Sequence, residues 1–324
     1  MKKLLVFHSP LSEAAPPDEL DVLDEVAFFK GGLVALGYDV VVMPFPYDMM
    51  ALQSTLEAHQ PAMVVNLVET LFSNGRLAHI APFLLDHFAV PYTGCPAEAI
   101  FHTNHKVLAK KTLQEAGILT PAFFTYEGLQ QFRGIIPGFF LVKSVWEHAS
   151  FGLDESNKLL FDQKDELIDQ MHVKGNGAEF FAEKYIDGRE FNISLLDSRT
   201  GPIVLPPAEI CFHYPDDKPR IVGYRAKWDE TSFEFANTAR SFSFEPEDKP
   251  LLDKLRRISL DCWSVFGLKG YARVDFRVDH QENIFVLEVN ANPCISQDSG
   301  FVAAAHHAGI TQKQLIANLV AAIA

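Results

Sequence analysis

Two apolar segments near the C-terminal end of the chain carry polar and charged side chains where strands are expected. In YARVDFRVD, Arg273 and Asp275 share one face of a strand, and in IFVLEVNANP, Glu288 and Asn290 share one face of the next. A carboxylate inside an apolar strand is costly unless it is paired or binds a ligand. Two carboxylates and an amide oxygen are hard ligands that suit Mg²⁺, with Mn²⁺ as a second option. The pattern predicts a metal site of Asp275, Glu288 and Asn290; an internal salt bridge from Arg273 to either carboxylate is the competing interpretation.

The same two segments are expected to form a hairpin. The strands 271–278 and 284–290 are separated by DHQEN, which has the length and composition of a turn. Strict alternation along the second strand puts Ile284 and Val286 on the face of Glu288. It predicts that the opposite face is buried, with the side chains of Phe285, Leu287 and Val289.

A second group of acidic residues lies in EFFAEKYIDGREF. Glu183 and Glu190 flank a turn at Asp187-Gly188. A carboxylate at a strand end can accept hydrogen bonds from ribose hydroxyls, and the backbone of residues 184–186 can contact an adenine edge. The competing interpretation is a strand–turn–strand unit with solvated charges.

Three lysines stand at positions that suit phosphate binding. Lys106 opens an expected helix, Lys143 ends the apolar strand FFLVK, and Lys227 lies in an expected loop, YRAKWDE. Cations converging on one place in an acidic protein form a clamp for phosphate groups. The usual alternative, an exposed solubilising lysine, fits Lys110 and Lys111 better.

The elements that must position these residues change in character along the chain. Apolar strands at 4–8, 40–43, 63–68 and 90–92 alternate with helical patterns at 19–36, 52–59 and 77–87, which predicts a parallel sheet with helices on both faces. A small mixed region follows, and antiparallel signals dominate from residue 189 onward. The predicted organisation is an α/β domain at 1–95, a central domain at 96–186 and an α+β domain at 187–324.

Composition excludes several classes of protein. Among 324 residues, 42 are acidic and 28 are basic, for a net charge of −14, so neither nucleic acid nor an anionic membrane surface is an expected partner. The cysteines fit no common zinc or disulfide pattern; they are Cys95, Cys211, Cys262 and Cys294. The opening apolar run is too short for a signal peptide. A cytoplasmic protein is the expectation.

The order of these motifs resembles a known superfamily. Lys106, Lys143, EKYIDGRE, AKW, ARVDF and LEVNANP follow one another as in ATP-grasp proteins, and the chain is most similar to D-alanine–D-alanine ligases. The resemblance implies an N-terminal parallel α/β domain, a small central lid domain and a mostly antiparallel C-terminal domain, with ATP between the last two. It also implies a homodimer, by analogy.

The resemblance implies a role for each matching residue. Arg273 would stabilise charge on the transferred phosphoryl group, Ser150 would lie in a loop over the reacting groups, and Lys227 would contact phosphate. Ser299 and Cys294 would contact substrate. The residues implied to bind ATP are Lys106, Lys143, Glu183, Lys184, Tyr185, Ile186, Glu190 and Lys227, and those implied to bind Mg²⁺ are Asp275, Glu288 and Asn290.

The resemblance is weaker where the family holds its first substrate. The N-terminal stretch SPLSEAAPPDELDVLDEV lacks the family's motif, with Glu13, Asp24 and Glu25 as candidate replacements, and Cys294 stands where the family has glycine. A positive φ at Cys294 would be strained. We therefore expect an ATP-dependent carboxylate–amine ligase that acts on small amino or carboxylic acids other than D-alanine. The alternative is a non-catalytic ATP-binding sensor or partner protein of the same fold.

Overall fold

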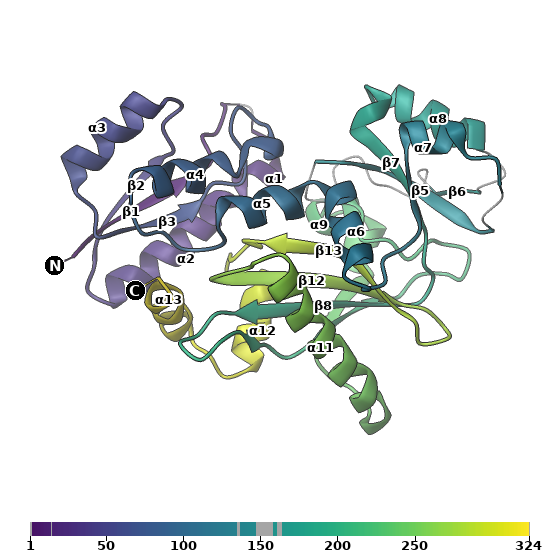
Figure 1. The fold of residues 1–324 in the computed structure, drawn as a ribbon. Helices are drawn as coiled ribbons and strands as arrows, with labels where there is room; N and C mark the ends of the chain where they lie inside the picture. Colours follow the sequence, from purple (N-terminus) through teal and green to yellow (C-terminus); the bar gives the residue numbers. More distant parts are fainter. Residues whose placement is uncertain (1, 14, 135–136, 147–157, 161–163, 324) are drawn as a thin grey trace.

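The computed structural model describes residues 2–13, 15–134, 137–146, 158–160 and 164–323, and its strands form three sheets (Figure 1). The expected parallel sheet in the N-terminal part and the mainly antiparallel sheet in the C-terminal part are confirmed. No helix within these residues is both long and apolar enough to cross a membrane.

The N-terminal sheet is parallel, with strand order β2-β1-β3. Its strands are β1 (Lys3–His8), β2 (Asp39–Pro44) and β3 (Met63–Leu67), and its helices are α1 (Pro17–Leu20), α2 (Val22–Ala35), α3 (Met49–His59) and α4 (Ile80–His87). The apolar run of β1 is fully buried from Leu4 to Phe7, as expected for a strand covered on both faces. The expected strand at 90–92 is wrong, because Tyr92 makes only an isolated bridge to Val64.

The central sheet has strand order β4-β7-β5-β6 and is antiparallel. The strands are β4 (Phe123–Thr125), β5 (Phe139–Ser144), β6 (Lys158–Leu160) and β7 (Phe180–Lys184), with helices α7 (Tyr126–Gln131) and α8 (Lys164–Val173) against them. A small core that includes Leu129, Phe140 and Met171 joins the sheet to the two helices. This unit lies apart from the N-terminal sheet in Figure 1.

The third sheet has strand order β11-β10-β8-β12-β13, and β9 pairs with β8. Its strands are β8 (Arg189–Leu196), β9 (Ile203–Val204), β10 (Ala208–Phe212), β11 (Thr238–Ser241), β12 (Tyr271–Val278) and β13 (Ile284–Ala291). One core joins this sheet to helices α5 (Ala97–Asn104), α6 (Lys106–Glu115) and α11 (Lys249–Val265). The short helices α9 (Tyr224–Trp228) and α10 (Phe233–Ala236) follow β10 in the chain.

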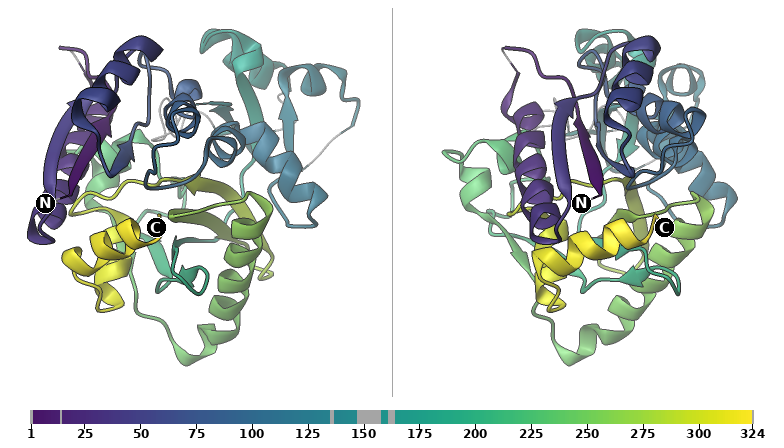
Figure 2. Two further views of the ribbon diagram at one scale, coloured as in Figure 1. Left: turned by 60° about the vertical axis from the view of Figure 1, so that its left-hand side comes forward. Right: turned by 90° about the vertical axis from the view of Figure 1, so that its left-hand side faces the viewer.

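The C-terminal helices α12 (Gly300–His307) and α13 (Gln312–Ala321) return to the N-terminal sheet. Their apolar side chains share a core with β1 and α2, and Figure 2 shows both chain ends on this side of the molecule. Thr311 caps α13 with a capping box. The domain bounds at residues 95 and 186 stay predictions.

The β12–β13 hairpin forms at the expected residues but contains a bulge. Asp275 pairs with Glu288 and Phe276 pairs with Val286, which leaves Leu287 as an extra residue in β13. The bulge reverses the alternation along β13, so Val286 is fully buried while Phe285 and Leu287 are only half-buried. The prediction of strict alternation is therefore wrong for the residues of β13 that precede Glu288.

Candidate active site

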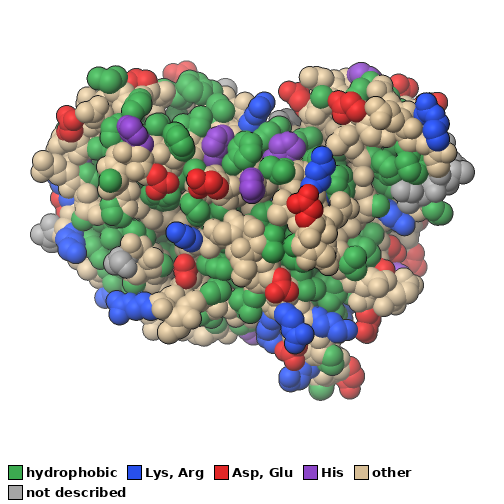
Figure 3. All heavy atoms as spheres, in the orientation of Figure 1, with side chains coloured by type: hydrophobic (Ala, Val, Ile, Leu, Met, Phe, Trp, Pro, Cys, Tyr) green, Lys and Arg blue, Asp and Glu red, His purple; other side chains and the backbone are tan. Residues whose placement is uncertain are grey.

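One cavity of about 1380 Å³ is lined by strand residues of the central and third sheets and by segments that follow strands of the N-terminal sheet. In Figure 3 the surface is hollowed between the N-terminal and central parts of the molecule. Ser150 lies outside the described residues. The other predicted site residues all line this cavity: Lys106, Lys143, Glu183, Lys184, Tyr185, Ile186, Glu190, Lys227, Arg273, Asp275, Glu288, Asn290, Cys294 and Ser299.

Asp275, on strand β12, accepts hydrogen bonds from its own strand and from the neighbouring strand β8. Arg273 Nε and Nη2 donate to its two oxygens at 2.7 and 2.9 Å. Asn192, opposite it on β8, donates to Oδ1 at 2.8 Å. Burial raises the pKa of Asp275, whereas Arg273 opposes that shift. The predicted internal salt bridge thus exists, and it is made by a predicted metal ligand.

Asn192 was missed in the sequence, although a signal for it exists. Strict alternation along REFNISLL puts Asn192 on the face of Glu190. In the sheet, Asn192 pairs with Asp275 and Glu190 pairs with Arg277. The charged faces of β8 and β12 therefore form one surface.

The donor set of β12 and β13 suits a hard divalent cation. Asp275 and Glu288 are cross-strand neighbours, and Glu288 adds to the upward shift of the Asp275 pKa. Asn290 Nδ2 donates to both carboxylates, at 3.0 and 3.4 Å. A cation between these groups would relieve the repulsion between the carboxylates, and rotation of the Asn290 amide would present its oxygen.

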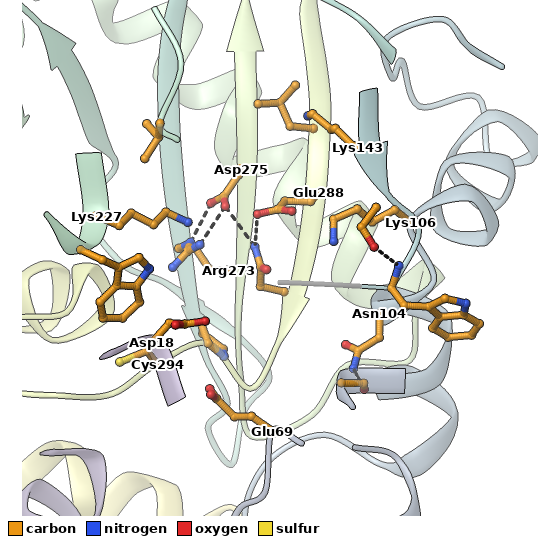
Figure 4. Close-up of a pocket in the computed structure, with 18 of the residues that line it drawn as sticks. Asp18, Glu69, Asn104, Lys106, Lys143, Lys227, Arg273, Asp275, Glu288 and Cys294 are labelled. Carbon is orange, nitrogen blue, oxygen red and sulfur yellow. Dashed lines mark hydrogen bonds and ion pairs between the residues drawn. The ribbon is translucent and has the colours of Figure 1, made fainter. Parts of the chain in front are cut away.

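Three lysines approach this surface from other elements. Figure 4 shows Lys227 on one side of Asp275, and Lys106 and Lys143 beyond Glu288 on the other. Burial lowers the pKa of Lys106 to about 8, opposed by Glu288. Burial also lowers the pKa of Lys227. Lys227 lies in α9, so the expectation of a loop there is wrong.

Glu183 lies within β7 and is 1% exposed. Its carboxylate forms ion pairs with Lys143, at 2.5 Å, and with Lys110. Burial alone would raise the pKa of Glu183, but the two lysines lower it. Lys110 is 2% exposed, so its interpretation as a solvated lysine is wrong.

Glu190 lies on β8 and is 8% exposed. It forms an ion pair with Arg277 of β12 at 2.9 Å. Burial raises the pKa of Glu190, and Arg277 opposes the shift. Because Glu183 and Glu190 are both buried and paired, the alternative of solvated charges on a plain turn is wrong.

The end of the cavity near residues 292–300 is built by the turn after β13 and the start of α12. Cys294 Sγ donates to Asp21 Oδ2 at 3.0 Å, and burial raises the pKa of this thiol. The expected strain at Cys294 is absent, because the positive φ of this turn lies at Asn292, a residue type that tolerates it. Ser299 caps α12. Arg240, which we missed, lines the cavity beside Gly300.

Acidic residues from the N-terminal part also reach this end. Asp18, Asp21 and Glu69 line the cavity, and Figure 4 shows Asp18 and Glu69 near Cys294. Burial raises the pKa of Glu69 to about 7, reinforced by Asp21 and Asp18. The side chain of Glu69 is exposed to solvent where it lines the cavity.

Of the three candidate replacements for the N-terminal motif, Glu25 packs against the turn at this end but does not itself line the cavity. Glu25 is 3% exposed and accepts a hydrogen bond from the backbone N–H of Ile295. Burial raises its pKa well above the usual range, and Glu69 adds to the shift. Glu13 and Asp24 are exposed and are not among the residues that line the cavity.

Comparison with known proteins agrees with this architecture. The family model described as D-ala D-ala ligase C-terminus matches residues 136–321. An uncharacterized protein of Sinorhizobium fredii, y4sG, is 30% identical over 273 residues, covering 82% of this chain and 78% of that protein. A D-alanine–D-alanine ligase of Psychrobacter is 29% identical over 243 residues, covering 74% and 68%.

Solved structures share the fold over nearly the whole chain. A D-alanine–D-alanine ligase from Bacillus anthracis, complexed with ATP, superposes with a TM-score of 0.73 at 21% identity and covers 99% of this chain and 97% of that one. D-alanyl-alanine synthetase A from Vibrio cholerae gives the same TM-score at 14% identity, with 99% and 98% covered.

The three sheets and the family match define an ATP-grasp protein. More particularly, the chain belongs to the D-alanine–D-alanine ligase family. It is an ATP-dependent ligase that forms C–N bonds.

Proposed function

We propose that this protein joins a carboxylate to an amine through an acyl phosphate, and that its substrates are small amino or carboxylic acids other than D-alanine. A carboxylate oxygen attacks the γ-phosphorus of ATP and the bond to the β–γ bridging oxygen breaks, which releases ADP. The amine nitrogen then attacks the acyl carbon, phosphate leaves, and the nitrogen loses a proton.

One observation carries this proposal. Carboxylates of two neighbouring strands, Asp275 and Glu288, face cations that come from three separate elements, Lys106, Lys143 and Lys227, within one cavity. Phosphoryl transfer requires positioning and charge neutralisation more than covalent help from the protein. This arrangement provides both.

The nucleotide would occupy the end near the central sheet. Lys106 and Lys143 would bind phosphate oxygens. Glu183 and the backbone of Lys184, Tyr185 and Ile186 would contact adenine. Glu190 would accept hydrogen bonds from ribose. The burial of Glu183 and Glu190 supports these roles, because their ion pairs hold both carboxylates in fixed positions.

Asp275, Glu288 and Asn290 would hold Mg²⁺, which when bound neutralises charge on the phosphates. Arg273 would stabilise the transferred phosphoryl group and the tetrahedral intermediate. Its guanidinium forms two hydrogen bonds with Asp275, which fix its orientation before substrate binds. Lys227 would contact the transferred phosphate from the opposite side of Asp275.

The other end of the cavity would bind the two substrates, the one that supplies the carboxylate and the one that supplies the amine. Asp18, Asp21 and Glu69 provide negative charge for an ammonium group, and Ser299 and Arg240 provide donors for a carboxylate. Cys294 contacts the acidic set through its hydrogen bond to Asp21. These charges favour substrates that carry both an ammonium and a carboxylate group.

ADP and phosphate release in the presence of ATP, Mg²⁺ and pools of amino acids tests the proposal. We expect release that depends on an acid–amine pair, together with an amide product in stoichiometric amount. Tight ATP binding without turnover on any pool would contradict the ligase proposal and favour the non-catalytic sensor.

A further inference from the structure

Lys110 is a buried cation that lines no part of the cavity, and the ligase mechanism gives it no role. Its side chain lies one helical turn after Lys106 on α6 and is 2% exposed. The ammonium group donates to Thr120 Oγ1 and to the carbonyl oxygen of Leu287, both at 3.0 Å, and forms an ion pair with Glu183. These contacts use all three donors of the ammonium group.

The contact with Leu287 falls on the bulge of β13. Leu287 is the residue without a partner in the β12–β13 register, and Glu288 follows it directly. The neighbouring Val286 N–H donates to the Leu119 carbonyl oxygen at 2.8 Å. Helix α6, through Lys110, and the segment after it, through Leu119, thus contact the bulge at two neighbouring residues. The bulge lets Glu288 face Asp275 while Val286 enters the core.

The contact with Glu183 reaches the central sheet. Glu183 pairs in register with Leu141 of β5 and Phe123 of β4. Its other carboxylate oxygen contacts Lys143 at 2.5 Å. Lys110 therefore determines the position of a carboxylate that in turn holds a cavity lysine.

We propose that Lys110 is a positioning residue of the ligase, whose ammonium group fixes Glu183 at the nucleotide end and the bulge that orients Glu288 at the metal end. The inference rests on the proposed function, in which Glu183 and Lys143 bind ATP and Glu288 binds Mg²⁺. A single buried ammonium group then links the two halves of the nucleotide site, which lie on separate sheets.

Lys110→Met removes the charge and keeps an unbranched apolar stem, and Lys111→Met is its matched control. Lys111 is the next residue of α6 and is exposed. ATP binding is measured by calorimetry without metal and then with Mg²⁺. Steady-state constants for ATP and Mg²⁺ and thermal unfolding complete the comparison.

We expect Lys110→Met to weaken ATP binding without metal, through Glu183, and to reduce the strengthening that Mg²⁺ gives the wild type, through Glu288. Loss of residues behind metal ligands typically costs about 10–100-fold in metal affinity or activity, and we expect that range for Mg²⁺. Lys111→Met should match the wild type in every constant.

Lys110→Arg keeps the charge but cannot reproduce the compact geometry of three ammonium donors. Lys110→Arg should weaken ATP binding without metal, and reduce its strengthening by Mg²⁺, less than Lys110→Met does. It serves as the test if the methionine variant does not fold. Either variant with wild-type ATP and Mg²⁺ constants per folded molecule, and only a lower unfolding temperature, would overturn the inference. Absence of ATP binding by the wild type would instead overturn the proposed function.

Discussion

The two ends of the cavity are built differently. At the proposed nucleotide end, the candidate side chains come mainly from strands whose register fixes their direction, as with Glu183 on β7 and Asp275 on β12. At the proposed substrate end most of them come from segments outside the sheets, such as the turn that carries Cys294; Arg240, on β11, is an exception. A strand imposes a regular spacing on the residues that face one side, and this spacing is visible in the sequence. A turn or loop imposes no such spacing.

The charge on the two ends also differs. Lysines surround the carboxylates at the nucleotide end, whereas Asp18, Asp21 and Glu69 give the substrate end a concentration of negative charge. The proposed ATP site and the proposed acid site therefore differ in the sign of the charge that their side chains bring together. The following predictions test this division, from the largest expected effect to the smallest.

Glu288→Gln should abolish turnover and leave the fold intact. The amide has nearly the same shape as the carboxylate, but it is a much weaker ligand for Mg²⁺. Activity at limiting Mg²⁺, with circular dichroism as a check of folding, measures the effect. Glu57→Gln, on the exposed face of α3, is the control. Wild-type activity of the Glu288 variant would show that this carboxylate has a structural role only.

Arg273→Ala should lower kcat by roughly 10²–10³-fold, the loss expected for one preorganised electrostatic group. ATP affinity should change much less, because the charge that Arg273 meets develops during the reaction. Stopped-flow measurement of ADP formation separates the two effects, with the exposed Arg199→Ala as control. Lost ATP binding with a near-normal kcat at saturation would assign Arg273 to ground-state binding.

D-alanine alone should give little ADP release compared with another acid–amine pair. A charged hydrogen bond contributes about 1.5–3 kcal/mol, or roughly 10–150-fold in affinity, and the family's N-terminal motif is absent. Steady-state ADP production with a panel of amino acids and small carboxylic acids measures this preference. Robust D-alanyl-D-alanine synthesis, unmatched by other pairs, would show that Glu25 or the acids near it replace the missing motif.

The KM for an ammonium-bearing substrate should rise as the pH falls from 8 to 6, by up to about 10-fold for loss of one charged contact. Burial raises the pKa of Glu69 to about 7, so Glu69 is mostly ionised at pH 8 and mostly neutral at pH 6. Glu69→Gln should show a high KM at pH 8 and a flatter profile. If the KM of the wild type decreases when the pH is lowered from 8 to 6, this assignment is contradicted.

Arg240→Ala should raise the KM for a substrate that carries a carboxylate by a few-fold, roughly the value of one hydrogen bond to a charged group that is open to solvent. The kcat and the KM for ATP should stay near wild type, because Arg240 lies beside Gly300 rather than at the nucleotide end. An equal change in the KM for ATP would contradict the proposal that ATP and the other substrates bind at separate ends of the cavity.

The sequence allowed accurate prediction of the hairpin because its strands and turn depend on local patterns. The strand at 271–278 was predicted with both its ends, and the second strand was predicted to within one residue. The bulge at Leu287 could not be predicted, because every residue of IFVLEVN suits a regular strand equally well. Its position depends on partners elsewhere in the chain, Lys110 and Leu119.

By itself, the sequence determined which charged residues alternate with apolar ones, and hence that Asp275, Glu288 and Asn290 could share a surface. Only the tertiary structure decided which charges are buried. Lys110 contacts Leu287 across 177 residues, and Glu25 contacts Ile295 across 270. A lysine on an amphipathic helix is solvated or buried according to what packs on it, and no local pattern records that partner.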